Sequence, residues 1–187
     1  MEIWHALTGL VERKVVQESI RTINEDLYSK PVKSLRFLLA SGGMSGEMDA
    51  GINMYTYLKA LPIEVETIGF GELDTAAAII FLGGKKRTAL ENCQFIFREG
   101  RYTIENVTAS VHAHEEAIAL FKRELEGLIF VIAKETGNDT EVVAQMLRRG
   151  KIMSAEESKE FGITGSIIAT LPLYQQNKLG FNDSQEA

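Results

Sequence analysis

The sequence has a single cysteine, Cys93, among its 187 residues. One cysteine cannot form a disulfide within the chain, and there is no Cys-x-x-Cys pair or Cys/His spacing of the kind that holds structural zinc. We therefore expect no metal and no other cofactor, and the cysteine content fits a reducing compartment.

Positive charge is also scarce. Lys and Arg number 20 against 26 Asp and Glu, so the formal net charge is −6. A chain with this balance has no sequence-wide positive field to hold nucleic acid or anionic lipid. We expect neither nucleic acid nor a membrane among its partners.

Long hydrophobic runs are missing as well. The longest, residues 76–82, is far too short to span a bilayer. The N-terminus carries Glu2 and lacks the basic region that opens a signal peptide. Together these absences predict a soluble cytoplasmic protein.

What is present is the composition of an ordinary globular protein. Hydrophobic residues make up 45% of the chain, and only three prolines interrupt it. The length fits one domain better than two. We expect a single domain over residues 1–172, followed by a polar C-terminal tail over residues 173–187.

Strand and helix signals alternate along this domain, which predicts an α/β fold. The expected strands are residues 3–10, 35–40, 65–70, 93–97 and 163–168. Six helices are expected. An apolar stripe from Val11 to Leu27 marks the first, the second is capped by Asp49 and ended by Pro62, and the third is the run 75–82. The fourth runs through residues 118–132 and stops at Gly137, the fifth is capped by Asp139, and the sixth begins at Ser154.

The run 75–82 is apolar on all sides, which predicts a short and fully buried helix. Asp74 directly precedes it and is the expected cap, because the free N–H groups of a first turn need an acceptor. Ser154 and Glu157 have the spacing of a capping box.

Several local strings, in this order and spacing, resemble the proteolytic subunit of the Clp protease, a member of the ClpP/crotonase superfamily. They lie between about residues 7 and 168, at positions 41–43, 50–52, 68–71, 89–92, 153–157 and 161–162. The resemblance implies a ClpP/crotonase-like spiral of ββα units and a long handle helix from about His114 to Thr136. It also implies assembly into rings.

Members of this family cut peptide bonds with a Ser-His-Asp triad. Matched position by position, Thr75 stands at the serine, Arg98 at the histidine and Gly150 at the aspartate. The resemblance further implies two main-chain N–H donors for an oxyanion, those of Gly43 and Ala76. The loop before the second helix departs from the family pattern, because the proline of Ser-Pro-Gly-Gly is missing and three residues are added.

These replacements remove the chemistry of a serine peptidase. An arginine stays protonated and has no acceptor atom, so Arg98 cannot serve as a general base. Thr75 keeps a hydroxyl but has no neutral imidazole to activate it, and Gly150 has no side chain to orient anything. The sequence predicts a proteolytically inactive protein that acts as an assembling subunit.

The expected partners follow from the same resemblance. They are further copies of the chain in a ring, or an active ClpP-like subunit in a hetero-oligomer. The family's N-terminal segment has almost no counterpart before Ile3, so the resemblance does not predict docking of an unfoldase ATPase.

Two alternatives remain open at this point. The first is an ATP-dependent Clp-type peptidase or hydrolase with altered catalytic residues that uses Thr75. The second is an acyl-CoA-binding crotonase relative that uses the N–H groups of Gly43 and Ala76 for a thioester carbonyl.

Other titratable residues are weaker catalytic candidates. The three histidines, His5, His112 and His114, are expected at the surface or in an interface. Lys85 or Lys86 would have to reach back along a helix of about 12 Å to meet Thr75.

Arg98 itself has two possible environments. It pairs with Glu72, Asp74 or Glu99 in the former substrate pocket, or it is solvated at the end of its strand.

Overall fold

The computed structural model describes residues 1–42, 46–100 and 110–171. Two sheets form within these residues. The larger sheet is parallel and holds, in spatial order, β1 (Glu2–Thr8), β2 (Ser34–Ala40), β3 (Glu64–Gly69), β5 (Lys86–Leu90) and β8 (Ser166–Ile168). In the smaller sheet β6 (Gln94–Phe97) lies between β4 (Glu72–Asp74), which is parallel to it, and β7 (Lys151–Met153), which is antiparallel.

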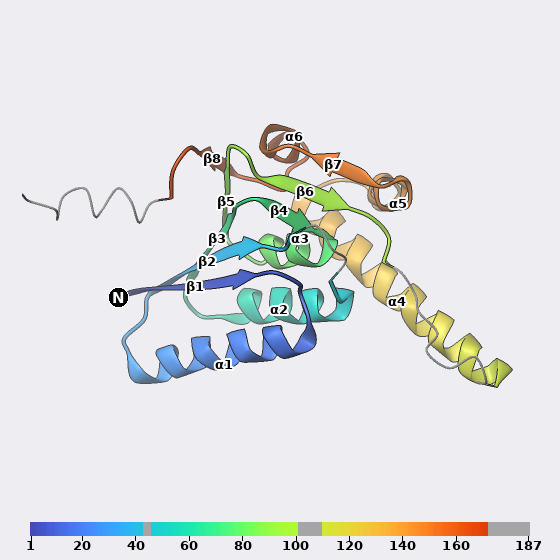
Figure 1. Ribbon diagram of the computed structural model, residues 1–187, viewed down its shortest axis with the longest axis horizontal. Coiled ribbons are helices and arrows are strands. Elements are labelled where there is room, and N and C mark those ends of the chain that lie inside the picture. The colour runs from blue at the N-terminus through green and yellow to red at the C-terminus, as the bar shows by residue number, and fades with distance from the viewer. Residues whose placement is uncertain (43–45, 101–109, 172–187) are drawn as a thin grey trace, which may run out of the picture.

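Six helices connect these strands in the described part of the chain (Figure 1). They are α1 (Arg13–Ser29), α2 (Met48–Ala60), α3 (Thr75–Leu82), α4 (Val111–Thr136), α5 (Thr140–Arg149) and α6 (Ala155–Glu160). The successions β3-β4-α3 and β5-β6-α4 each place their first strand in the larger sheet and their second in the smaller one. This arrangement confirms the predicted α/β fold of ββα units.

The core lies between the larger sheet and the helices. Leu35, Phe37 and Leu39 alternate along β2 and are completely buried, because successive side chains of a strand point to opposite faces. They belong to one apolar cluster with Val16 and Ile23 of α1 and with residues of α2 and α3. This burial of every second residue fixes the register of the strand.

Helix α3 is buried along its whole length, as predicted. All eight of its residues are buried. α2 packs closely against it: a Cβ on Gly51 would lie 2.8 Å from the carbonyl oxygen of Ala76. Only glycine allows the two helix backbones to approach this closely.

Helix α4 is the long helix that the resemblance implies, and Gly137 ends it with φ of 74°. Its C-terminal half packs into the core, where Leu128 and Ile132 are fully buried. Near this end, the Glu135 carboxylate accepts a hydrogen bond from the Tyr55 hydroxyl at 2.7 Å. The same carboxylate lies 2.8 Å from Lys59 Nζ, so α2 holds the anchored half of α4.

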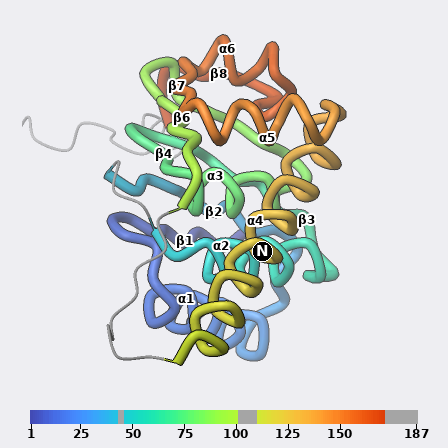
Figure 2. The backbone as a smooth tube through the Cα atoms, turned by 90° about the vertical axis from the view of Figure 1, so that its right-hand side faces the viewer, coloured from blue at the N-terminus to red at the C-terminus, as the bar shows by residue number. Residues whose placement is uncertain are grey.

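The N-terminal half of α4 leaves the body of the protein in Figure 1, and in Figure 2 it lies in front of α2 and α1. Its apolar side chains Val111, Ile118 and Leu120 are exposed, the first by 75%. The projecting half therefore presents apolar surface with no cover among the described residues.

Most predicted helix ends are confirmed, but one cap is wrong. The N-cap of α2 is Glu47, and Asp49 lies within the first turn. The Asp49 carboxylate instead accepts a hydrogen bond from Arg13 Nε at 2.6 Å. The caps at Asp74, Asp139 and Ser154 are as predicted, including both bonds of the capping box.

Three strands, β4, β5 and β7, were not expected from the sequence. Each has three to five residues and begins with a charged one. The last expected strand is shorter than predicted, since only residues 166–168 pair with β5. The predicted tail, residues 173–187, lies outside the described residues.

None of the helices in the described part of the chain has the length and apolar character needed to cross a membrane.

The close approach of α2 and α3 yields a stability prediction. Gly51→Ala forces a Cβ against the main chain of Ala76 and should lower the free energy of unfolding by about 1–3 kcal/mol. Gly127→Ala in α4 is the control, because its nearest neighbour to a new Cβ, Ile52 Cδ1, is 3.9 Å away. That variant should gain about 0.5–1 kcal/mol from helix propensity. Urea unfolding measures both, and equal stability changes in the two variants would contradict the packing argument.

Candidate functional site

The candidate site begins at the N-terminus of α3, directly after β4. Asp74 ends β4 and caps the helix, and Thr75 is the first helical residue. Both side chains are enclosed: Asp74 is 0% exposed and Thr75 is 7% exposed. The buried alanines and large apolar residues of α3 thus hold this end of the helix in the interior.

The Thr75 hydroxyl is held by the main chain that follows β6. Its oxygen accepts a hydrogen bond from Arg98 N–H at 3.0 Å. As a donor, it lies 3.0 Å from the carbonyl oxygen of Arg98 and 3.3 Å from that of Ile96. The hydroxyl proton is therefore directed at carbonyl oxygens, which stabilise a hydrogen bond but do not act as a general base at neutral pH.

The Asp74 carboxylate ties three segments together. Oδ1 accepts the N–H of Ala77 at 2.9 Å, and Oδ2 accepts the N–H of Gly46 at 2.7 Å. The main-chain N–H of Asp74 donates to Ser41 Oγ at 2.6 Å. One buried residue thus joins α3 to both flanks of the segment between β2 and α2.

Burial sets the ionisation of this carboxylate. Desolvation raises the pKa of Asp74 above its ordinary value, and the bonds from Ala77, Gly46 and Ser41 oppose that rise. The positive charge of Arg98 opposes it as well. Arg98 therefore lies close enough to Asp74, one of the partners expected from the sequence, for its charge to act on this carboxylate.

Arg98 and Gly150 lie on neighbouring segments at this corner. Arg98 follows β6 directly, and Gly150 lies between α5 and β7, whose Lys151 pairs with Phe97 of β6. A Cβ on Gly150 would be 4.0 Å from the carbonyl oxygen of Phe97. The structure therefore brings the three residues matched to the triad, Thr75, Arg98 and Gly150, to the end of β6.

The backbone at Gly150 restricts what can stand there. Its φ is 71° with ψ of 123°, outside the region that residues with a side chain commonly adopt. A side chain at this position would be strained whatever space surrounds it.

The histidines lie on other elements. His5 belongs to β1, and its Nε2 lies 2.9 Å from Asp26 Oδ2 of α1. His112 and His114 lie in the first turns of α4, at the end that projects from the body (Figure 1). The imidazoles are thus distributed between the β1/α1 layer and the tip of α4.

The other charged candidates also have partners of their own. Lys85 pairs with Glu64, and Lys86 Nζ lies 2.8 Å from Glu66 of β3. Glu99 Oε1 lies 3.9 Å from Arg148 Nε. Lys85 and Lys86 are thus paired at the larger sheet, and Glu99 lies near Arg148 of α5.

Of the two expected oxyanion donors, Gly43 lies outside the described residues. Ala76 is the second residue of α3 and is 1% exposed. Gly46, which the sequence did not single out, lies against it: a Cβ on Gly46 would be 3.1 Å from the Ala76 Cβ and 2.8 Å from that of Val11. The signal available in the sequence was a third glycine, three residues after Gly42-Gly43.

The described residues contain no group of three or more His, Cys, Asp or Glu side chains that could hold a metal ion.

Comparison with known proteins identifies one family. The family model for Clp protease matches residues 6–170. The chain is 28% identical over 164 residues to the ATP-dependent Clp protease proteolytic subunit 2 of Treponema pallidum, covering 86% of this chain and 74% of that protein. It is 26% identical over 163 residues to the subunit 2 of Treponema denticola, covering 86% and 79% respectively.

A solved structure shows the same fold. A mutant of ClpP1 from Listeria monocytogenes aligns with a TM-score of 0.77 and 20% sequence identity, covering 89% of this chain and 91% of that one. The spiral of ββα units is therefore shared.

The position of the Thr75 hydroxyl yields a second prediction. Thr75→Val keeps the shape of the side chain but removes the hydrogen-bond partner of the Arg98 main chain, so the free energy of unfolding should fall by about 1–3 kcal/mol. Thr56→Val removes an exposed hydroxyl that bonds only to Ile52 O in α2, and it should change stability by less than about 0.5 kcal/mol. Chemical denaturation compares the two, and equal losses would show that the Thr75 hydroxyl has no structural role of its own.

Proposed function

The chain belongs to the Clp protease family, and from that premise we propose that it is a proteolytically inactive member that serves as an assembling subunit. The observation that carries the proposal is the environment of Thr75. Its hydroxyl both accepts from and donates to the main chain of Arg98, at 3.0 Å each. A serine-type mechanism instead needs the hydroxyl to donate to a neutral base, which then returns the proton to the leaving amine.

The residues around the hydroxyl support the same proposal. Arg98 stays protonated and offers donors only, so it cannot take the proton. Gly150 has no group that could orient a base. Asp74, the nearest carboxylate along the chain, already accepts two main-chain N–H groups. With no general base beside this hydroxyl among the described residues, attack on a peptide carbonyl loses the step on which turnover depends.

The assembling role rests on α4. Its projecting half exposes Val111, Ile118 and Leu120. Burial of these side chains by another chain is favourable, because it removes apolar surface from water. The names of the two Treponema relatives describe them as proteolytic subunits. The partner we propose is further copies of this chain in a ring, or an active relative in a hetero-oligomer.

Peptide hydrolysis tests the inactive state. The purified protein should cleave a short fluorogenic peptide no faster than its Thr75→Ala variant does, and a serine-directed phosphonate should not label it. A purified active Clp proteolytic subunit, assayed in parallel, shows that substrate and conditions are suitable. Turnover that disappears in Thr75→Ala would overturn the proposal and support a peptidase that uses this threonine.

Native mass tests the assembling role. Sedimentation should give a mass several times that of the 20.8 kDa chain. Replacing Ile118 and Leu120 with glutamate should lower this mass, because charge is then placed on the apolar half of α4. Tyr28→Glu is the matched control, since Tyr28 is a 94% exposed aromatic residue on α1. A wild-type monomer at micromolar concentration would remove the proposed ring of identical chains.

A further inference from the structure

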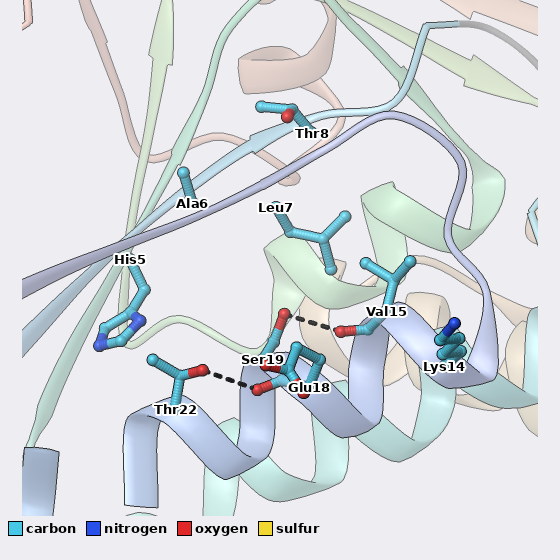
Figure 3. Close-up of a pocket in the computed structure, with 9 residues that line it drawn as sticks. All are labelled: His5, Ala6, Leu7, Thr8, Lys14, Val15, Glu18, Ser19 and Thr22. Carbon is cyan, nitrogen blue, oxygen red and sulfur yellow. Dashed lines mark hydrogen bonds between the residues drawn. The ribbon is translucent and has the colours of Figure 1, made fainter. Parts of the chain in front are cut away.

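The larger sheet has two faces with different surroundings. Successive side chains of a strand point to opposite faces, so Phe37 of β2 lies on the side of the helices and Leu38 lies on the outer side. Figure 3 shows the same alternation on β1, where His5 and Leu7 point toward α1 and Ala6 points away from it. The outer face is therefore the one that carries Leu38 and Ala6.

An apolar strip crosses this outer face. Strand pairing places Leu38 of β2 opposite Ile68 of β3, and Leu90 of β5 opposite Ile168 of β8. Ile68 is 0% exposed, and the other three are half-buried. Within the described residues, none of the four belongs to the apolar core cluster or to the side chains packed against it. These four residues, the outer strip, thus form a second apolar surface that is separate from the core.

The charged side chains beside the outer strip pair with one another. Arg36 Nε lies 3.1 Å from Glu2 and 3.2 Å from Glu66. Lys86 Nζ lies 2.8 Å from Glu66 Oε1, which also accepts a hydrogen bond from the Thr88 hydroxyl at 2.8 Å. The two positive and two negative side chains therefore balance. This face favours an apolar occupant over a charged one, because burial of an apolar group needs no ionic partner.

The chain itself supplies an apolar segment close to the outer strip. It leaves β8 at the strip, and the tail, residues 173–187, lies outside the described residues. The tail sequence is polar except for two apolar pairs, Leu173 with Tyr174 and Leu179 with Phe181. Only the second pair is spaced so that both side chains point the same way in an extended segment. This pair can therefore cover an apolar surface with both of its side chains.

The position of the tail favours it over a separate protein. Neighbouring strands lie about 4.8 Å apart, so Leu38 is about 14 Å from Ile168 across the sheet. An extended chain covers that distance in about five residues. Because the tail is tethered beside the outer strip, its effective concentration there is roughly millimolar. A contact too weak to hold a free peptide can therefore hold this segment.

We propose that the tail covers the outer strip of its own chain, with Leu179 and Phe181 packed on the half-buried side chains. The contact is autoinhibitory, because a partner that binds the outer face of the larger sheet must first displace the tail. It is independent of the residues matched to the triad and of assembly through α4.

Disulfide trapping in the full-length protein tests the contact. Ala6, exposed on the outer face opposite Leu38, and Asn182 are replaced together by cysteine. Mild oxidation should close a disulfide within one chain. Cys93 is a poor competitor, since it is buried and burial raises the pKa of its thiol.

Two controls separate contact from tethering. Tyr28→Cys with Asn182→Cys places the first thiol at a 94% exposed position of α1, and this pair should close at least about tenfold more slowly. Leu179→Ser with Phe181→Ser, added to the Ala6/Asn182 cysteine pair, should slow closure by a similar factor, because it removes the apolar contact and keeps both thiols. Gln175→Ser with Gln176→Ser changes two polar residues of the tail and should leave the rate unchanged.

Three results would overturn the proposal. The first is equal closure of the Ala6 and Tyr28 pairs. The second is an unchanged rate after Leu179→Ser with Phe181→Ser. The third is a disulfide that joins two chains, seen as twice the chain mass on a non-reducing gel, which would show that the tail reaches a neighbouring copy.

Discussion

The complete burial of α3 is the constraint on which the surrounding structure depends. A helix with no exposed side chain cannot satisfy its first N–H groups with water, so acceptors must come from the protein. Asp74 supplies them to Ala77 and, across the core, to Gly46. Thr75 then connects the same end of the helix to β6. The close approach of Gly51 to Ala76 completes the enclosure.

Under the proposed function, this constraint explains how the corner at the end of β6 persists without peptidase chemistry. In a serine peptidase the first hydroxyl of such a helix must remain available to substrate. Here the Thr75 hydroxyl connects α3 to the residue that follows β6. The buried Asp74 carboxylate, whose pKa is raised by desolvation, accepts the main-chain N–H groups of Ala77 and Gly46. Under the proposed function, these contacts contribute to the fold in the place where a peptidase would keep reactive groups. Fold and activity are then separable, because the positions that decide activity lie at the ends of elements.

How far the sequence predicted this arrangement depended on the length and pattern of each element. α3 was predicted because the seven apolar residues that follow Thr75 run without interruption to Gly83. β4, β5 and β7 were missed because strands of three to five residues with charged starts carry no usable alternation. Their pairing is decided by tertiary contacts, which a local pattern does not contain.

The cap of α2 and the role of Gly46 were missed for a similar reason. Asp49 has the residue type of a cap, but Arg13, distant in sequence, binds its carboxylate within the helix. Gly46 acts through its N–H and through the absence of a side chain, and neither is visible without the neighbouring elements. The triad positions, by contrast, followed from the resemblance alone, and the structure adds what those residues contact.

Two uncovered surfaces of the described structure, on α4 and on β1, favour different kinds of contact. The projecting half of α4 offers apolar side chains, whose burial is favourable against any complementary apolar surface. In the described structure, the outer edge of β1 offers directional main-chain N–H and C=O groups instead. Figure 1 shows the projecting half of α4 reaching away from the body and β1 bordering the larger sheet. The two surfaces therefore differ in chemistry, since one favours apolar contacts and the other favours main-chain hydrogen bonds.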